Sequence, residues 1–455
     1  VAFNDGWRFH LGEVAGAETP GFDDSGWRTL DLPHDWAIEG DFSQDNPSGT
    51  GGGALPGGIG WYRKTFDVAP ALLKKHTYID FDGAYMNATV YINGHKLGTR
   101  PYGYASFSYD LTPWLHAGRN VVAVHVDNAE QPNSRWYSGC GIYRNVWLRT
   151  LSDVHIPLWG QQIISEVTDN EARINISTEL SFKKKERVRV CSELLNADGK
   201  QVAKSASIVE TGKKNSATTV EGKISISDPH LWSPDSPYLY TLATYVQDAK
   251  SGEVLDSYMQ PVGLRYYSFD AKNGFSLNGK RMKINGVCLH HDAGALGAVV
   301  NRRAIERQLQ IMKEMGVNAI RSSHNPPAPE LLELCDEMGL MVMNETFDMW
   351  RKKKTAHDYA RYFNEWHERD MDDLIRRDRN HPSVIIWSIG NEVLEQWTDA
   401  AADTLSLEEA NLILNFGHSK DKLASEGEMS VNSLLTRKLA DRVRELDPTR
   451  PVTAG

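Results

Sequence analysis

Residues 381–392, with the sequence HPSVIIWSIGNE, place an amide and a carboxylate directly after a short apolar run. The run is β-branched and nearly continuous, which is typical of a parallel strand covered on both faces. In a barrel of alternating strands and helices, side chains at the carboxyl ends of the strands point into the active-site mouth. We therefore expect Glu392 to act as a general acid/base.

Three other strand-like segments of the same region also end in polar residues, namely 290–292 (HHD), 321–325 (RSSHN) and 344–345 (NE). Polar residues from four separate strands that meet at one rim are what an active site on this fold requires. Considered one at a time, His290 and His291 are also consistent with histidines of the core or rim that have no catalytic or binding role. Arg321 is likewise explained as a buried ion-pair partner of Glu345.

Acid/base hydrolysis of a glycoside normally needs two carboxyl groups, which lie about 5–5.5 Å apart in retaining enzymes. The later acids stand in helical or loop contexts and not at a strand end: Glu395, Glu408, Glu409, Glu426, Glu428 and Glu445. We therefore expect the second carboxylate to lie outside these 455 residues and residues 1–455 alone to be inactive. The HExxH zinc motif and the GxSxG nucleophile elbow are both absent.

Composition fits a folded chain of roughly three domains of about 150 residues each. The chain has 455 residues, of which 40% are hydrophobic and 24% charged, and its net charge of -10 is spread along the sequence. This disfavours nucleic acid or an anionic membrane surface as the main partner and favours a neutral ligand. The four cysteines have no metal-ligand spacing and are expected to be buried thiols.

No apolar run approaches the ~20 residues needed to cross a bilayer, and no charged-then-apolar leader is present. We therefore expect no membrane insertion. Because the sequence begins at Val1, a cytoplasmic protein and a protein exported after removal of a leader are both open. The sequence is compatible with a homo-oligomer.

Residues 1–150 show short alternating runs broken by Gly, Pro and Asp, for example 89–94 and 121–126, which indicates a β-sandwich. Asn93-Gly94 predicts a hairpin turn. Residues 43–60 are rich in glycine but lack the Lys-Ser/Thr pair of a nucleotide-binding loop, so a flexible surface loop is expected. Residues 151–270 alternate again, in 187–191 and 238–245, and suit an immunoglobulin-like sandwich.

Residues 271–455 follow a different pattern, in which strands at 282–289, 318–321, 340–344 and around Trp387, within 381–392, alternate with helices at 302–315, 329–338, 362–379 and 434–446. Alternation of this kind predicts a parallel sheet. With a last strand at 451–453 there are about five strands, whereas a closed (β/α)8 TIM barrel takes about 250 residues. We expect a barrel truncated after about its fifth strand, an open sheet, and a natural polypeptide that continues past Gly455.

Seven motifs resemble the β-galactosidase branch of glycoside hydrolase family 2 along nearly the full chain. They are GWYR (60–63), RWYSG (135–139), GIYR (141–144), LWSP (231–234), NGV (285–287), RSSH (321–324) and WSIGNE (387–392). The resemblance implies a jelly-roll sugar-binding-type domain, an immunoglobulin-like domain and a TIM barrel, in that order. This is the order that the patterns indicate independently.

The resemblance also implies roles for single residues. Glu392 would protonate the leaving oxygen and later activate water, and Asn391 would hold the sugar hydroxyl next to the reacting carbon. Arg321 matches an arginine that orients the carboxylates, and His290 and His324 match histidines that contact the sugar. The family's nucleophile is a glutamate at the end of a later strand.

Some relatives bind magnesium through a glutamate and a histidine just after the third barrel strand, where this chain has Asp348-Met349-Trp350. Only Asp348 offers the hard oxygen that Mg²⁺ prefers, so we predict no metal and no cofactor. Asp348 and Glu345 are instead expected to help bind the sugar.

Residues 290–297 (HHDAGALG) resemble β-galactosidases more than β-glucuronidases. The predicted function is thus a retaining exo-β-glycosidase that acts on terminal β-galactosides or oligosaccharides. A β-glucuronidase, a β-mannosidase and a non-catalytic carbohydrate-binding protein stay open as alternatives. The long segment 393–433 is either a lid, with Trp397 as a stacking platform, or an external helical hairpin.

Overall fold

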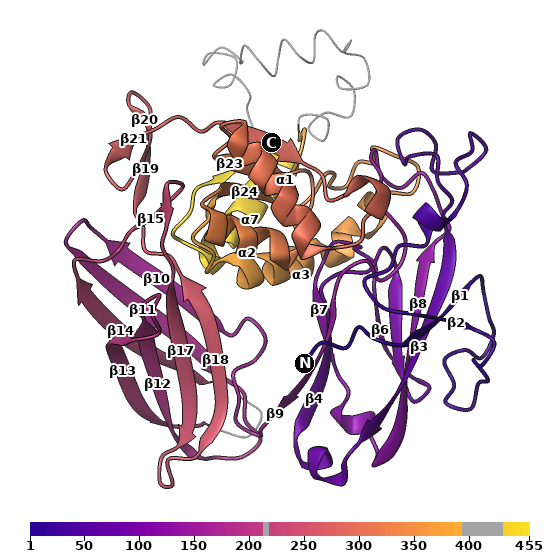
Figure 1. Cartoon of the computed structure of the whole chain (residues 1–455), viewed down its shortest axis with the longest axis horizontal. Helices are drawn as coiled ribbons and strands as arrows, with labels where there is room; N and C mark the ends of the chain where they lie inside the picture. The colour runs from indigo at the N-terminus through magenta and orange to yellow at the C-terminus, as the bar shows by residue number, and fades with distance from the viewer. Residues whose placement is uncertain (213–217, 394–430) are drawn as a thin grey trace.

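The computed structural model describes residues 1–212, 218–393 and 431–455. Two β-sandwiches stand side by side and carry a layer of parallel strands and helices above them (Figure 1). The first sandwich, drawn in indigo and violet, precedes the second, drawn in magenta, and the orange and yellow layer comes last. The order of domains predicted from the sequence is confirmed.

The first sandwich has the jelly-roll architecture. A six-stranded sheet, in the order β2-β1-β3-β8-β5-β6, packs on a three-stranded sheet in the order β7-β4-β9. The strands are β1 (Trp7–Leu11), β2 (Arg28–Leu30), β3 (Gly58–Val68), β4 (His76–Phe81), β5 (Ala88–Ile92), β6 (His95–Arg100), β7 (Phe107–Asp110), β8 (Gly118–Asn128) and β9 (Val146–Leu151). Single turns of 3-10 helix lie at η1 (Ala37–Glu39), η2 (Pro70–Lys74) and η3 (Thr112–Trp114).

The turn between β5 and β6 is the predicted two-residue hairpin. Ile92 pairs with His95 across it, and Asn93 and Gly94 have φ angles of 50° and 83°. Both angles are left-handed, as a type I′ turn requires, and asparagine and glycine accept this conformation most readily. The dipeptide therefore fixes the register of this hairpin.

The glycine-rich segment before β3 is a loop, as expected, but it is held by its own hydrogen bonds. The backbone N–H of Ser43 donates to Ala54 O at 3.0 Å, and the N–H of Ala54 donates to Gly49 O at 2.8 Å. Ser48 and Leu55 are buried, and the Ser48 hydroxyl donates to the Leu55 carbonyl at 2.7 Å. The loop packs on the first sandwich through these two side chains.

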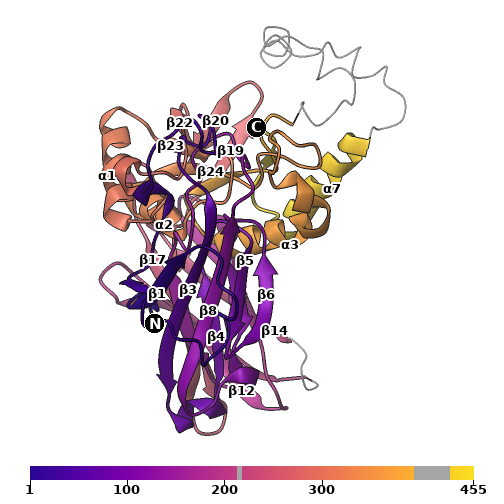
Figure 2. The same ribbon diagram turned by 90° about the vertical axis from the view of Figure 1, so that its right-hand side faces the viewer.

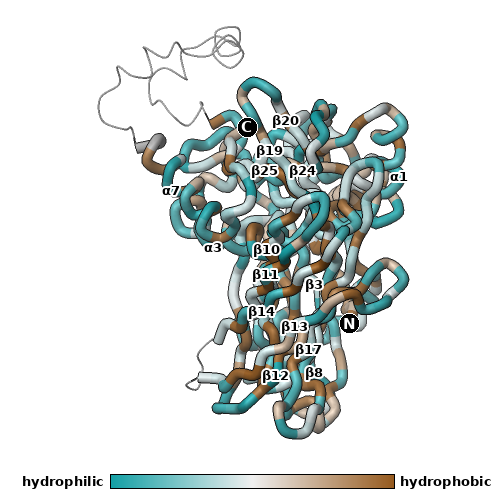
Figure 3. The backbone as a smooth tube through the Cα atoms, turned by 90° about the vertical axis from the view of Figure 1, so that its left-hand side faces the viewer, coloured by the Kyte–Doolittle hydropathy of each residue, from teal (hydrophilic) through white to brown (hydrophobic). Residues whose placement is uncertain are grey.

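The second sandwich is immunoglobulin-like, with sheets in the orders β10-β11-β14 and β13-β12-β17-β18. Its strands alternate buried and exposed residues, so hydrophobic and hydrophilic stretches interleave along the tube in Figure 3. The strands are β10 (Gln161–Val167), β11 (Glu171–Leu180), β12 (Arg187–Leu195), β13 (Gln201–Glu210), β14 (Thr218–Ser227), β17 (Tyr240–Asp248) and β18 (Val254–Val262). Short ladders follow at β15 (Trp232–Ser233) with β16 (Ser236–Pro237), and at β19 (Tyr267–Asp270), β20 (Gly274–Leu277) and β21 (Lys280–Arg281).

The last layer is a partial TIM barrel of five parallel strands in the order β22-β23-β24-β25-β26. The strands are β22 (Gly286–Leu289), β23 (Ala319–Ser322), β24 (Met341–Glu345), β25 (Val384–Ser388) and β26 (Val452–Thr453). The helices are α1 (Arg302–Glu314), α2 (Pro329–Met338), α3 (Ala360–Asp378) and α7 (Val431–Leu446), with a 3-10 turn at η4 (Gly294–Leu296). The predicted strand and helix positions are confirmed to within a few residues.

Helix ends in the barrel follow local sequence signals. The side chain of Asn301 caps α1 by accepting the N–H of Ala304 at 3.0 Å. Helix α2 starts with Pro329 at its first position and ends at Gly339, whose φ of 74° is left-handed. A side chain at Gly339 would also meet the backbone of Pro234, so glycine is needed there for close approach.

The parallel sheet is open, and among the described residues β22 and β26 are its edges. Cys288 lies on β22 and is exposed, which corrects the expectation that all four cysteines are buried. Its thiol lies on the same face of the sheet as Arg321, 3.8 Å from that guanidinium. Cys140 and Cys335 are buried as expected, and Cys191 is half-buried.

The first sandwich and the barrel share one aromatic core. Tyr102 packs against both Phe347 and Tyr359, with ring centroids 5.7 and 4.2 Å away, and its hydroxyl donates to Thr346 O at 2.6 Å. The fully buried guanidinium of Arg144 donates to the backbone oxygens of the segment before α2. In Figure 2, α1 and α2 lie at one end of the parallel sheet and α3 and α7 at the other, all above this sandwich. None of the helices in the described part of the chain is both long and apolar enough to span a membrane.

Candidate active site

Strand β25 carries the central residues of the site. Val384 and Trp387 are fully buried, and the chain continues through Gly390 to Asn391 and Glu392 at the carboxyl end of the sheet. The backbone of Glu392 has a φ of 48°, and its N–H donates to Gly455 O at 2.7 Å. Asn391 is buried, whereas 43% of the Glu392 side chain is exposed. The acid therefore faces the open rim, as predicted.

Two cations converge on Glu392 from outside its strand. One guanidinium nitrogen of Arg135, which belongs to the first sandwich, donates to Glu392 Oε2 and to Asp348 Oδ1 at 2.7 Å each. The ammonium of Lys354 lies 3.4 Å from Glu392 Oε2 and 3.1 Å from Asp348 Oδ1, and it also donates to Asn391 O at 2.8 Å. The rim therefore holds two carboxylates that are bridged by two positive charges.

Asn391 is fixed from both sides. Its Nδ2 donates to Asp348 Oδ1 at 2.7 Å, and its Oδ1 accepts from Arg321 Nη2 at 2.7 Å. Since both ends of the amide have partners of opposite hydrogen-bonding character, its orientation is defined. This is the behaviour expected of a residue that presents a fixed polar edge to a ligand.

Glu345 lies one layer deeper, at the end of β24, and is fully buried. Arg321 binds its carboxylate in a bidentate way, with nitrogen–oxygen distances of 2.9 and 3.0 Å. His324 Nδ1 lies 2.8 Å from Oε1, and the Ser388 hydroxyl donates to Oε2 at 2.6 Å. The alternative in which Arg321 is an ion-pair partner of Glu345 is therefore correct, and the same arginine also holds Asn391.

Three aromatic rings cluster beside the carboxylates. The indole of Trp136 lies 5.1 Å from the ring of His290 and 5.5 Å from that of His324, and the two imidazoles are 5.5 Å apart. His290 is half-buried, and its Nδ1 is buried without a hydrogen-bond partner in the described structure. His291 instead packs on Tyr104 and Tyr143, away from this group. His291 is therefore a structural residue.

The charges of the site set the protonation of its acids. Partial burial by itself would raise the pKa of Glu392, but the hydrogen bond and charge of Arg135, with Lys354, hold that pKa below its ordinary value. Burial would also raise the pKa of Asp348, but the charges of Lys354 and Arg135 outweigh burial and lower that pKa. Burial lowers the pKa of His290, with a contribution from His324, and lowers that of His291 to about 3. At neutral pH, Glu392 is therefore a carboxylate, and His290 and His291 are neutral.

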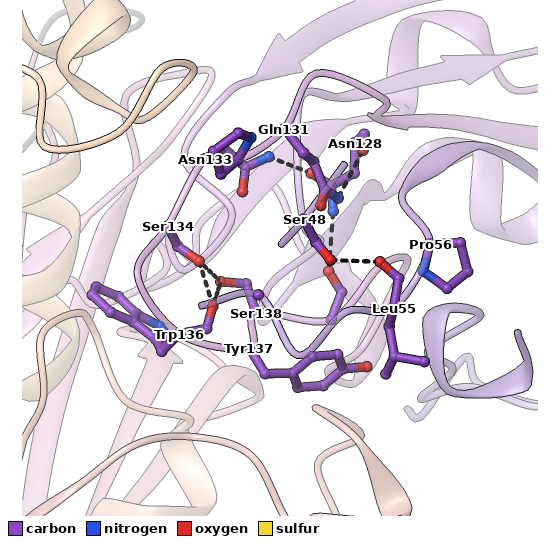
Figure 4. A pocket seen from close by; sticks show the side chains of 13 residues that line it. Ser48, Leu55, Pro56, Asn128, Gln131, Asn133, Ser134, Trp136, Tyr137 and Ser138 are labelled. Carbon is purple, nitrogen blue, oxygen red and sulfur yellow. Dashed lines mark hydrogen bonds between the residues drawn. The ribbon is translucent and has the colours of Figure 1, made fainter. Parts of the chain in front are cut away.

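Hydrogen bonds hold the loop that carries Trp136, as Figure 4 shows. The Asn133 amide donates to Asn128 Oδ1 at 2.6 Å, and the hydroxyls of Ser134 and Ser138 lie 2.7 Å apart. These residues line a cavity of about 20 Å³, which is far smaller than a sugar needs. The cavity is thus part of the support of the loop and not a ligand site.

The rim set predicted from the sequence is brought together on one edge of the sheet, in the form of Asn391, Glu392, Arg321, His324 and Glu345 with His290 and Asp348 beside them. Sequence reasoning missed three participants. Arg135 and Trp136 were noted only as parts of a family motif, and Lys354 carried no signal at all. Trp397 and the proposed lid lie outside the described residues.

No three or more His, Cys, Asp or Glu side chains of residues 1–212, 218–393 and 431–455 are grouped so that they could hold a metal ion. The acids at the rim are instead paired with arginine and lysine. The predicted absence of a magnesium site stays a prediction.

Comparison with known proteins identifies the family. The models for glycosyl hydrolases family 2 match three consecutive parts of the chain: the sugar binding domain at residues 54–152, the central family 2 domain at 154–265 and the TIM barrel domain at 271–454. Together they account for most of the sequence.

Individual relatives agree with these models. The chain is 64% identical over 459 aligned residues to the β-galactosidase BoGH2A of Bacteroides ovatus, which covers 100% of this chain and 53% of that protein. It is 30% identical to a β-glucuronidase of Bacteroides fragilis, over 87% of this chain and 56% of that protein. The crystal structure of a β-glycosidase from Bacteroides vulgatus superposes with a TM-score of 0.87 at 41% identity, over 100% of this chain and 54% of that one. The chain thus spans about half the length of the curated relatives it matches, and it belongs to glycoside hydrolase family 2.

Proposed function

We propose that these residues are part of a retaining exo-β-glycosidase that hydrolyses terminal β-galactosides, with Glu392 as its acid/base. The observation that carries the proposal is the half-exposed carboxyl of Glu392 at the end of β25, beside an amide that Arg321 and Asp348 hold in one orientation. A carboxyl group that faces solvent at this edge of a TIM barrel is in the position of a catalytic group. The 64% identity to a β-galactosidase supports the choice of glycone.

The charges at the rim favour a neutral sugar over a glucuronide. A glucuronide brings a carboxylate, which needs a positive partner once it is out of water. Arg135 and Lys354 are each bonded to Asp348 and Glu392, and Arg321 is bonded to Glu345. Within the described residues, the cations of the site are therefore engaged by the protein's own carboxylates.

The nucleophile is proposed to lie in a part of the protein outside these 455 residues. Asp348 Oδ1 and Glu392 Oε2 share one nitrogen of Arg135, so these two oxygens are close together. Asp348 is nevertheless unsuited to attack a sugar, because it is buried and its Oδ1 already accepts from Arg135, Lys354 and Asn391. The matched relative is about twice as long as this chain, and we propose that a further glutamate at a strand end lies in the part that this sequence does not cover.

The proposed chemistry is a double displacement. The protonated Glu392 gives its proton to the glycosidic oxygen as the nucleophile bonds to the anomeric carbon and the leaving alcohol departs. The resulting Glu392 carboxylate then takes a proton from water as that water displaces the nucleophile. A bound glycoside buries Glu392 and a nearby ionised nucleophile adds like charge, and both raise its pKa against the pull of Arg135 and Lys354.

Glu392→Gln in the full-length protein tests the assignment with two aryl β-galactosides. Turnover of the one with a poor leaving group should fall by about 10²–10⁴-fold, while the one with an activated leaving group should lose far less, because only the former needs a proton. Glu365→Gln, an exposed glutamate on α3, is the matched control and should change neither rate. Equal losses on both substrates would contradict the acid/base role, and preferential turnover of the matching β-glucuronide would overturn the choice of glycone.

A further inference from the structure

Figure 1 shows the two sandwiches side by side below the barrel. A cleft of about 340 Å³ is lined by residues from all three parts. Its wall is built from β4 and β9 of the first sandwich, from the segment before β10 and from β18 of the second, and from α2 and α3 of the barrel. It has no lining residue in common with the contacts described around Glu392. Its size lies at the lower end of the range typical of small-molecule sites.

Partly exposed aromatic rings line this cleft. Trp147 and Tyr258 are each 37% exposed, and Trp159 is half-buried. The indole of Trp147 is oriented by a hydrogen bond from its Nε1 to Asp82 Oδ2 at 2.7 Å. Trp159 has a φ of 56°, a left-handed conformation that a bulky residue rarely adopts. Rings that are exposed yet fixed offer flat apolar faces to a ligand at little entropic cost.

The carboxyl groups of Asp82 and Glu330 also line the cleft. Glu330, in the first turn of α2, is 92% buried; its Oε1 accepts from Asn145, but its Oε2 is buried and finds no hydrogen-bond partner among the described residues. Asp82 stands next to it, and burial together with the charge of Glu330 raises its pKa to about 7. Asp82, unlike Glu330, is only partly buried, so its carboxyl can accept a hydrogen bond from a ligand in the cleft.

The remaining charges restrict the class of ligand. Arg149 is paired with Asp80, and Arg377 with Asp378, so the two arginines of the cleft are already engaged and an anionic ligand is disfavoured. The acids are not grouped to hold a metal ion in the described part of the chain. A ligand that fits must donate hydrogen bonds on one side and present an apolar face on the other. A pyranose ring has both features, with hydroxyl groups at its edge and axial C–H bonds on its face.

We propose that the cleft is a second, non-catalytic carbohydrate site that takes a neutral oligosaccharide. One ring lies on Trp147 or Tyr258, and its hydroxyl groups donate to Asp82, which lines the cleft and is only partly buried. The site is formed jointly by all three parts of the fold, so it can hold a glycan chain only when they are assembled. The proposal does not depend on the identity of the sugar that is cleaved at Glu392.

Binding of cellotetraose and galactotetraose to the full-length protein tests the proposal by calorimetry. The measurement is made in a Glu392→Gln background so that substrate is consumed far more slowly. Trp147→Ala should weaken binding of at least one of the two by about tenfold, because a stacked ring is lost. Trp114→Ala is the matched control, because this tryptophan is 41% exposed on the same sandwich but does not line the cleft. Binding at the Glu392 rim is the same in both variants, so their difference reports on the cleft alone.

A second variant tests the same cleft independently, so that misfolding of Trp147→Ala would not decide the result. Tyr258→Ala changes the opposite wall of the cleft, on β18, and should weaken the same ligand while the thermal unfolding midpoint of the protein is unchanged. Equal affinities in Trp147→Ala, Tyr258→Ala and Trp114→Ala would overturn the proposal. It would also be overturned if calcium chloride, but neither tetrasaccharide, raised the unfolding midpoint in a way that Glu330→Gln abolishes, because the cleft would then be a cation site.

Discussion

One guanidinium nitrogen of Arg135 lies 2.7 Å from a carboxylate oxygen of Glu392, although 257 residues separate the two in sequence. The arginine comes from the jelly-roll sandwich and the acid from the barrel. The sugar-binding-type domain therefore does more than support the barrel, because it places a charge on the proposed acid/base. The rim is completed only when both domains are present.

Removal of Arg135 should move the pH dependence of the reaction. Burial raises the pKa of Glu392, and Arg135 is the first of the groups that lower it. In Arg135→Met the pKa of Glu392 therefore rises, and the acid stays protonated to higher pH. The alkaline limb of kcat/KM, which reports on the free enzyme, should shift to higher pH. Arg303→Met, on the exposed face of α1, should leave it in place, and an unmoved limb in Arg135→Met would show that Glu392 does not set it.

Substitution of Trp136 should weaken substrate binding more than it slows the chemical step. Its indole packs beside His290 and His324 and faces the site from the jelly-roll loop. Trp136→Ala should raise KM about tenfold with a smaller change in kcat, because an apolar contact to the sugar is lost, and Trp136→Phe should restore most of the affinity. If kcat falls as much as kcat/KM, the ring is needed in the transition state and not for ground-state binding.

Variants of Arg321 and Glu345 should affect the stability of the fold and the activity differently. Arg321→Met leaves the fully buried Glu345 carboxylate without its bidentate partner and should destabilise the fold by about 3 kcal/mol. The double variant Arg321→Met/Glu345→Leu removes both charges and should recover most of that stability in denaturant unfolding. Its activity should stay low, because Asn391 still lacks the Arg321 bond. Recovered activity would mean that the arginine serves only to neutralise Glu345.

The strand and helix positions of the barrel could be predicted because their signals are local. The apolar run 384–388 is short and bounded, and Pro329 and Gly339 mark the ends of α2. Strand ends on a parallel sheet face one edge, so the polar rim followed from the same signals. This reasoning could not find Arg135, because its role depends on how two domains pack. Lys354 was missed because it lies in a segment between β24 and α3 that has no periodicity.

Asp82 should make stability depend on pH in a predictable direction. Burial and Glu330 raise its pKa from an ordinary value of 3.8 to about 7, so the folded state holds a proton that the unfolded state releases between these values. Stability therefore falls as pH rises through this window. Asp82→Asn keeps an acceptor for Trp147 and should raise the unfolding midpoint at pH 8 by about 2 °C or more, with little effect at pH 4. Asp67→Asn, an exposed aspartate on β3, is the control, and an equal gain at both pH values would refute the assignment.

The most direct test of the central claim is the intact mass of the full-length protein after incubation with an activated 2-fluoro-β-galactoside, followed by mapping of the labelled peptide. This reagent traps the glycosyl-enzyme of a retaining galactosidase. The account predicts a gain of one fluorosugar, carried by a glutamate outside residues 1–455. A label on Asp348 or Glu392, or a full-length protein that hydrolyses galactosides without ever acquiring the label, would contradict it.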